Sequence, residues 1–343
     1  MQNKTFTASK DPTFEQWSNY WLRTYIRPVA KPGGYEHYRD NLSKHIVPKL
    51  GAYHLSELTV PVVQQFLNDE AEHGNLRDGG PLSAKSIKNM RVVLDTCCKR
   101  AVAEGVMSSN PVPLTVIKHC KSKRVTVMQD EDQIKLQNFL LSRKDSRSNA
   151  ILLAMYIGPR LGEICALRWK HYDFEQGILH FEETVRRIAA DEAAELPYGQ
   201  RTSLVFSAVK TDSSDRELYL SEDLQELMHM QYELFREKFG RCPTQGDFIF
   251  FSNVGGVLDP DNLSSHFTRT LDQLGLPHVK FHALRHTFAS RAVEKGMAVS
   301  TLSGILGHAD VTTTTHYYLH PREAEMRRAT MGLGRISEAG GVA

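Results

Sequence analysis

The sequence predicts a mainly α-helical protein with a small antiparallel β-sheet, an α+β fold in two domains. Apolar side chains in the first hundred or so residues recur at helical spacing. Between residues 178 and 220, three stretches instead alternate apolar and polar side chains, which is the period of strands. A basic segment that is poor in large apolar residues lies between the two patterns. Because 343 residues are enough for two cores, we expect an all-helical N-terminal domain and a mixed C-terminal domain.

The N-terminal domain is expected over residues 12–117, after a tail of residues 1–11. Near its start, aromatic residues recur at helical spacing and fit core packing better than base stacking: Phe14, Trp17, Trp21 and Tyr25. Further helices are predicted over residues 35–46, 60–73 and 83–105. Thr59 and Pro61 suit the start of the second of these. In the third, four residues are expected to point inward: Ile87, Leu94, Cys98 and Ala101.

The C-terminal domain is expected over residues 128–331, between a basic linker of residues 118–127 and a glycine-rich tail of residues 332–343. The boundary is placed near residue 122. Helices are predicted over residues 149–157 and 161–169, and strands over residues 178–185, 203–209 and 216–220. Residues 210–214 are expected to join the last two strands as a hairpin turn. A short buried strand is predicted at residues 248–251, and only helices and turns from Asp261 onward.

The composition fits an ordinary intracellular globular protein. Apolar residues make up 41% and charged residues 24% of the chain. No apolar run approaches the roughly 18 residues that a membrane span needs, and the N-terminus lacks the layout of a signal peptide. The cysteines are odd in number and lack the paired spacing of zinc sites, so we expect buried or incidental thiols: Cys97, Cys98, Cys120, Cys165 and Cys242.

Positive charge is concentrated in one part of the chain. The net charge is only +2, but residues 83–124 hold nine basic and two acidic side chains, a net of +7. A solvated helix face explains part of this excess, and the alternative is an electrostatic footprint for a phosphate backbone. On the second interpretation, the candidate DNA-binding residues lie on the predicted helix and in the linker: Lys85, Lys88, Arg91, Lys121, Lys123 and Arg124.

Residues that suit phosphate chemistry gather near the C-terminus. His282 and Arg285 are three apart, so on a helix they share one face and can grip one small anion. A phosphate has the geometry that a guanidinium fork fits, and this grip needs no metal. His308 and the adjacent Tyr317 and Tyr318 follow downstream. If a phenol reaches the same phosphate, the segment contains most of an active site for phosphoryl transfer.

A further arginine lies at a predicted tight turn just before a helix. Glycines on both sides of Arg160, at 158 and 162, let the backbone come close to a ligand. A guanidinium near a helix N-terminus suits an anion, although a capping turn with a surface arginine is the alternative. Glu163 is expected either to hold a neighbouring cation or to favour the helix start.

Taken in order, these residues resemble the tyrosine recombinase (phage integrase) family. Residues 158–169 (GPRLGEICALRW) are similar to its first arginine box, and residues 282–289 (HALRHTFA) to its H-x-x-R box. Residues 306–320 (LGHADVTTTTHYYLH) are similar to the box that carries its nucleophile. The H-x-x-R motif alone is weak evidence, whereas three boxes in order at the family's spacing are strong. The resemblance covers roughly residues 12–330.

The resemblance implies a nucleophile and its electrostatic support. Tyr318 would attack a DNA phosphate, release a 5′ hydroxyl and remain linked as a 3′-phosphotyrosine. Arg160 and Arg285 would hold the two non-bridging oxygens and stabilise the developing charge, as Mg²⁺ does in many other phosphoryl transferases. Their charges also favour the phenolate form of the tyrosine. No cofactor, metal or ATP is expected, because the covalent link keeps the phosphate activated.

The resemblance also implies the proton donors. Lys210 would protonate the leaving oxygen as general acid, His282 would assist proton transfer at the nucleophile, and His308 would hydrogen-bond the phosphate. A lysine at a turn is usually only solvated, but Lys210 is the only lysine between Lys170 and Lys238. The family carries its lysine between the two arginine boxes, which favours the functional reading.

Spacing alone does not choose between Tyr317 and Tyr318, since family members place the nucleophile nine or ten residues after the histidine that matches His308. A histidine two residues after the nucleophile is common in the family, and His320 has that relation to Tyr318. Tyr318 is therefore favoured.

As a recombinase, the protein would clamp duplex DNA between its core-DNA-binding and catalytic domains and exchange strands as a homotetramer on two sites. Integration and excision of a mobile element, an accessory directionality factor and a cytoplasmic, nucleoid-associated location are further expectations. Two alternatives remain: a non-catalytic DNA-binding protein of the same fold, and a relaxing enzyme of the type IB topoisomerase kind. The intact set of site residues argues against the first, and the small helical domain against the second.

The chain departs from the family pattern in three places. Ile157 and Pro159 stand where threonine and leucine are commoner, so the backbone of the first box is expected to differ. Residues 186–203 form a long insertion that either contacts DNA or a neighbouring subunit, or is a disordered excursion. Because the helical unit begins near residue 12, we expect the additional arm-DNA-binding domain of many phage and transposon relatives to be missing.

Overall fold

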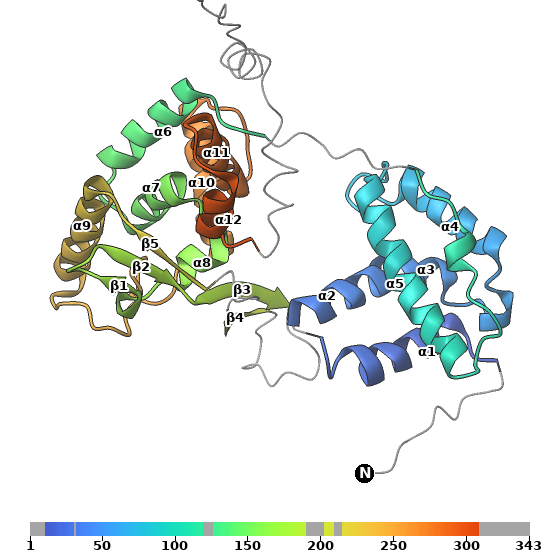
Figure 1. Cartoon of the computed structure of the whole chain (residues 1–343). Coiled ribbons are helices and arrows are strands. Elements are labelled where there is room, and N and C mark those ends of the chain that lie inside the picture. The colour runs from blue at the N-terminus through green and yellow to red at the C-terminus, as the bar shows by residue number, and fades with distance from the viewer. Residues whose placement is uncertain (1–10, 31, 119–125, 190–201, 209–214, 309–343) are drawn as a thin grey trace, which may run out of the picture. The chain divides into compact units, whose positions relative to one another are not determined.

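The computed structural model describes residues 11–30, 32–118, 126–189, 202–208 and 215–308. The chain divides into two compact units, Met1–Lys123 and Arg124–Ala343. The described part of the first unit is helical, whereas the second adds five short strands in two antiparallel sheets (Figure 1). The predicted fold class, mainly α with a small antiparallel sheet component, is therefore confirmed.

The first unit is packed around the aromatic stripe at its start. Phe14, Trp17 and Trp21 are buried in its core, and Tyr25 packs against that core, so the prediction of core packing is confirmed. Helix α1 begins after Thr13, whose hydroxyl accepts a hydrogen bond from the backbone N–H three residues on. The helical elements of this unit follow in chain order: α1 Phe14–Trp21, a π-helical turn Leu22–Ile26, α2 Pro32–Asn41, a second π-helical turn Leu42–Ile46, α3 Val47–Leu50, a 3-10 turn Leu55–Glu57, α4 Val60–His73, α5 Ala84–Ala103 and a 3-10 turn Val112–Leu114.

Helix α5 is the long basic helix that the sequence predicts. It begins after Ser83, whose Oγ accepts from the backbone N–H of Ser86 at 3.1 Å. Its apolar positions repeat at helical spacing and face the core, as predicted for Ile87, Leu94, Cys98 and Ala101, all of which are buried.

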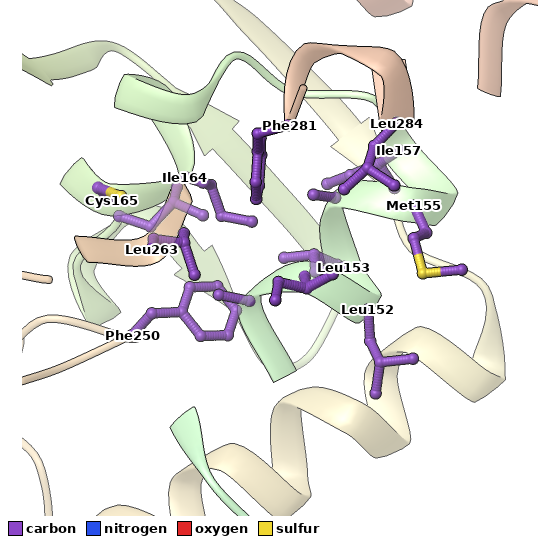
Figure 2. Packing of buried hydrophobic residues seen from close by; sticks show 14 of the residues in the cluster. Leu152, Leu153, Met155, Ile157, Ile164, Cys165, Phe250, Leu263, Phe281 and Leu284 are labelled. Atoms are coloured by element: carbon purple, nitrogen blue, oxygen red, sulfur yellow. The ribbon is translucent and has the colours of Figure 1, made fainter. Parts of the chain in front are cut away.

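Helix α7 lies at the centre of the second unit. Ten of its twelve residues are buried, and after its polar first turn the sequence is almost entirely apolar, which is the pattern of a core helix. It packs against α6, α8, α9, α10 and α11. Figure 2 shows Leu153 and Ile157 of α7 in the same core as Ile164 of α8, Leu263 of α10, Leu284 of α11 and the loop residues Phe250 and Phe281.

The helices of the second unit largely follow the predictions. The helix expected over residues 161–169 ends earlier, at Ala166, and a 3-10 turn Trp169–His171 follows it. The described α-helices of this unit are α6 Asp130–Ser142, α7 Ser146–Ile157, α8 Leu161–Ala166, α9 Glu222–Phe239, α10 Pro260–Leu274, α11 His282–Glu294 and α12 Val299–Leu306. No helix among the described residues is long and apolar enough to cross a membrane.

The strands form one three-stranded and one two-stranded sheet. The first has the order β1-β2-β5, with Ile178 opposite Tyr219 and Phe181 opposite Arg216. The second pairs β3 with β4, with Val185 opposite Phe206. Their bounds are β1 Tyr172–Asp173, β2 Ile178–Phe181, β3 Glu183–Ala189, β4 Thr202–Ala208 and β5 Arg216–Tyr219.

Three strand predictions were wrong in detail. The stretch 178–185 is not one strand, because the chain changes pairing partner at Glu182, whose carboxylate accepts from Lys170 Nζ at 2.7 Å and lies 2.9 Å from His171 Nε2. The strands β4 and β5 are not a hairpin, since they belong to different sheets among the described residues. Residues 248–251 form only isolated bridges, from Phe248 to Arg168 and from Phe251 to Val257, and Ile249 and Phe250 between them are buried in the core.

Candidate active site

Arg160 is placed by the tight turn between α7 and α8. Gly158 ends α7 with a φ of 61°, and a Cβ there would come within 2.7 Å of the Phe288 ring. Both facts require glycine at this position. Arg160 itself caps α8, its backbone N–H donating to the Glu163 carboxylate at 2.9 Å. Its side chain keeps 38% of its surface exposed, so this guanidinium faces solvent.

Glu163 is a buried carboxylate held by two arginines. Only 2% of its side chain is exposed. Arg160 Nη1 donates to Oε1 at 2.5 Å, and Arg216 Nη2 donates to Oε2 at 2.9 Å. Burial alone would raise the pKa of Glu163, but the charges of Arg216 and then Arg160 outweigh it and lower that pKa to about 2. The carboxylate is therefore ionised at any physiological pH and links the α7–α8 turn to strand β5.

Three guanidinium groups bind three consecutive backbone carbonyls at the end of α12. Arg216 Nε donates to the carbonyl of Ile305 at 2.6 Å, Arg285 Nη2 to that of Leu306 at 2.5 Å, and Arg160 Nη2 to that of Gly307 at 2.8 Å. Arg285 also donates from Nη1 to the carbonyl of Gly158 at 2.9 Å. The three arginines come from different elements, β5, α11 and the α7–α8 turn, so the end of α12 joins all of them.

The three arginines stabilise the negatively polarised C-terminus of α12. The last carbonyls of a helix lack intrahelical partners and carry the negative end of its dipole, so cations there are stabilising. Gly307 ends α12 with a φ of 64°, and His308 follows directly. The position of His308 is thus fixed by the same arginines that form the cluster.

The histidines of the cluster are held in their neutral form. Burial, and after it the charges of Arg285 and Arg160, lowers the pKa of His308 to about 4. His282 remains exposed as a residue, but partial loss of hydration and then Arg285 and Arg160 lower its pKa as well. His286, whose ring lies edge-on to that of His282 at 4.6 Å, has a pKa of about 4, again chiefly because of burial. A neutral imidazole donates a hydrogen bond from one ring nitrogen and accepts one at the other.

The cluster suits an anion better than a cation. In the described part of the site, the guanidinium groups of Arg160, Arg216 and Arg285 lie together with the one carboxylate of Glu163, so positive charge is in excess there. A guanidinium carries more N–H donors than the two side-chain bonds of Arg160 use, and this side chain is exposed. Among the described residues, no three His, Cys, Asp or Glu side chains are placed to hold a metal ion. Chemically, the site can bind a phosphate and move protons at its edge.

The structure brings five of the predicted site residues together: Arg160, Glu163, His282, Arg285 and His308. It also differs from the predicted grip, because Arg285 is only 2% exposed and bonds to backbone carbonyls, whereas His282 on the same helix is exposed. Other predicted residues lie outside the described residues: Lys210, Tyr317, Tyr318, Lys121, Lys123 and Arg124.

The basic residues of α5 fall into two kinds. Lys85 and Lys88 are exposed, as expected of side chains that contact a ligand. Arg91 is half-buried, and its guanidinium donates to Thr115 Oγ1 at 3.0 Å and to the carbonyl of Val112 at 3.1 Å. Its geometry is that of a structural residue that fixes the segment after α5, which the charge pattern alone did not reveal.

Sequence reasoning overlooked two members of the cluster, Arg216 and His286. Arg216 stands in the predicted strand 216–220 in phase with Leu218 and Leu220, all three being buried. An arginine on the apolar side of an alternating strand is a signal that could have identified it, because a buried cation needs a partner. His286 lies one turn after His282 on α11, a spacing that puts the two rings side by side.

Both units of the chain match known protein families. Residues 129–325 match the phage integrase family, and residues 13–70 match the phage integrase N-terminal SAM-like domain. A protein described as "Tyrosine recombinase XerC-like" from Caldanaerobacter subterraneus subsp. tengcongensis is 26% identical over 327 residues, which cover 91% of this chain and 80% of that protein.

Two solved structures share the fold. The Tn1549 transposon integrase in complex with transposon right end DNA has a TM-score of 0.75 at 20% identity, covering 94% of this chain and 99% of that one. A lambda integrase tetramer bound to a Holliday junction has a TM-score of 0.63 at 21% identity, covering 90% and 80%. Since the family match spans more than half of the chain, this protein belongs to the phage integrase family, the tyrosine-type site-specific DNA recombinases.

Proposed function

We propose that this protein cleaves and rejoins DNA at specific sites through a 3′-phosphotyrosine formed on Tyr318. The observation that carries the proposal is the convergence of Arg160, Arg285, His282 and His308 in one positively charged cluster. A protein that only binds DNA does not need two guanidinium groups and two neutral imidazoles at one point. A phosphoryl-transfer site does.

In the proposed reaction the phenolate of Tyr318 attacks the phosphorus atom of a backbone phosphodiester. The bond from phosphorus to the 5′ oxygen breaks, and Lys210 gives that oxygen its proton. Arg160 and Arg285 stabilise the charge on the non-bridging oxygens as the transition state forms. His308 donates a hydrogen bond to the phosphate, and His282 accepts the tyrosine proton. Rejoining reverses these steps with the 5′ hydroxyl of another strand, so no ATP is consumed.

We further propose that the protein acts as a homotetramer on two duplex sites and moves a mobile element into and out of DNA, aided by an accessory directionality factor. The lambda integrase tetramer on a Holliday junction and the Tn1549 integrase on transposon DNA share this fold and support the proposal. The exposed Lys85 and Lys88 of α5, with Lys121, Lys123 and Arg124, are proposed to bind the DNA backbone.

The test is a suicide substrate: a duplex from the junction between the encoding element and its flanking DNA, nicked beside the cleavage site. The wild-type protein should accumulate a covalent DNA complex in EDTA and without nucleotide. Tyr318→Phe should abolish the complex, and Tyr317→Phe should retain it. No complex from the wild type would leave only a DNA-binding role. Relaxation of supercoiled DNA without strand transfer between duplexes would instead favour a topoisomerase.

A further inference from the structure

Arg216 is a buried cation that binds two groups of the candidate site. Its side chain is 6% exposed and lies over the Phe181 ring, with the guanidinium carbon 4.5 Å from the ring centroid. Burying a cation is unfavourable unless it is paired and hydrogen-bonded. Here the pairing is with Glu163, and the hydrogen bond is with the carbonyl of Ile305. Glu163 and the Ile305 carbonyl therefore stabilise the buried charge of Arg216, and Arg216 in turn holds both groups in place.

Two of the contacts of Arg216 lead to two different proposed catalytic groups, Arg160 and His308. Through Glu163, whose other oxygen accepts from Arg160, it fixes the direction of the exposed guanidinium. Through the Ile305 carbonyl it holds the end of α12, three residues before His308. A planar guanidinium can make both bonds at once in fixed directions, which a lysine ammonium at the end of a flexible stem cannot do as well.

We propose that Arg216 is a positioning residue that sets Arg160 and His308 in register with each other for the cleavage of DNA. The inference rests on the proposed function, because it names what aligns the groups of that same site. The role proposed for Arg216 is indirect. Its effect is on the geometry of Arg160 and His308, and a displacement of about 1 Å in such groups costs roughly 100-fold in rate.

The decisive variants are Arg216→Met, Arg216→Lys and the matched control Arg187→Met. Arg187 also anchors a strand to a carboxylate, donating from Nε to Asp259 Oδ2 at 2.9 Å, but it makes no contact with the cluster in the described structure. On the nicked substrate at saturating DNA, Arg216→Met should form the covalent complex about 10- to 100-fold more slowly. Its DNA affinity should stay within about twofold of the wild type, because it removes no proposed DNA contact. Arg187→Met should cleave at the wild-type rate.

A pH profile separates positioning from a loss of folded protein. The charged or titratable groups that act on Glu163 are Arg160 from its own segment, Arg216 from β5 and His282 from α11. Without Arg216 the Glu163 carboxylate protonates at higher pH and releases Arg160. The cleavage rate of Arg216→Met should therefore fall further as the pH is lowered toward 5, whereas Arg216→Lys, which keeps a cation beside Glu163, should have a pH profile close to that of the wild type. In a Glu163→Gln background the same substitution should leave the profile unchanged.

The inference would be overturned if Arg216→Met cleaved as fast as Arg187→Met. It would equally be overturned if its rate loss were the same at every pH and matched the loss of folded protein measured by circular dichroism. If Arg216→Met does not fold, Arg216→Lys carries the test, with slower cleavage at unchanged affinity as the expected result. A wild-type protein that forms no covalent complex would refute the proposed function. Hydrogen exchange at residues 299–308 would then still report whether Arg216 holds α12.

Discussion

Both units of the protein bury a glutamate between two basic partners, and the two clusters differ in what surrounds them. In the first unit, Glu70 of α4 lies 2.7 Å from His45 Nδ1 and 2.8 Å from Lys49 Nζ. In the second, Glu163 accepts from two arginines at 2.5 and 2.9 Å. Each carboxylate is about 2% exposed. In both sites, then, a buried carboxylate lies within hydrogen-bonding distance of two basic side chains.

The residues around each glutamate distinguish the two clusters: those around Glu70 suit a structural role, and those around Glu163 suit a reactive site. Lys49 also pairs with Asp69, so two carboxylates share its ammonium group, and the first cluster joins α4 to α3. The second cluster adds Arg285 and carbonyls from α12, with His308 beside them, and retains an excess of positive charge. Burial and ion pairing therefore do not identify a functional site by themselves. Charged side chains that come from several elements and leave a net charge in one place are the better indication.

The largest expected effect comes from neutralising each glutamate in turn. Glu163→Gln removes the charge that orients Arg160, so the covalent complex should form about 100-fold more slowly on the nicked substrate. Glu70→Gln should leave that rate unchanged at saturating DNA, and lower the free energy of unfolding of the first unit by about 1–3 kcal/mol. Hydrogen exchange resolved by peptide should show the loosening in α4 and not in α11. Equal cleavage defects in the two variants would remove the distinction between the clusters.

A smaller effect is expected from pH. The folded protein holds the pKa of His286 and His308 at about 4, below the ordinary value of 6.5. Between these values the unfolded chain binds more protons than the folded one, so stability present above pH 6.5 is lost as the pH falls toward 4. The loss should be about 1–2 kcal/mol for the pair after allowing for solvent screening.

Urea unfolding of the wild type at pH 7.5 and 4.5, followed by hydrogen exchange in α11, measures this loss. The double variant His286→Asn/His308→Asn should show a flatter dependence on pH. If the wild type and this variant have the same slope, the two imidazoles are not held neutral in the folded protein.

The smallest effects are expected on α5. Lys85→Ala and Lys88→Ala should each weaken DNA binding several-fold and reduce the slope of log Kd against log salt by about one. Arg91→Ala should leave this slope unchanged and increase hydrogen exchange at residues 112–115, because its guanidinium bonds to the backbone there. Fluorescence anisotropy with a labelled duplex at several salt concentrations checks both statements. A lower slope for Arg91→Ala would return it to the DNA-binding set.

Much of the fold follows from local pattern, and the exceptions have a common cause. Helix α4 begins and ends where its apolar period and proline indicate, and α5 within two residues of its predicted bounds. The pairing of the strands could not be predicted in this way, because an alternating pattern indicates a strand but not the strand with which it pairs. The chain changes its pairing partner at Glu182. The motifs indicated Arg160, His282, Arg285 and His308, which do lie together. What they could not indicate is that the C-terminal carbonyls of α12 hold the cluster together.

The function proposed for this cluster is covalent DNA cleavage in which Tyr318 is the nucleophile. The most direct measurement is peptide mapping by mass spectrometry of the complex trapped on the nicked duplex, with the polarity of the attached strand determined from end-labelled DNA. We expect one modified peptide, with the phosphate on Tyr318 and the DNA attached through its 3′ end. A modification on Tyr317, attachment through a 5′ end, or no covalent peptide at all would contradict it.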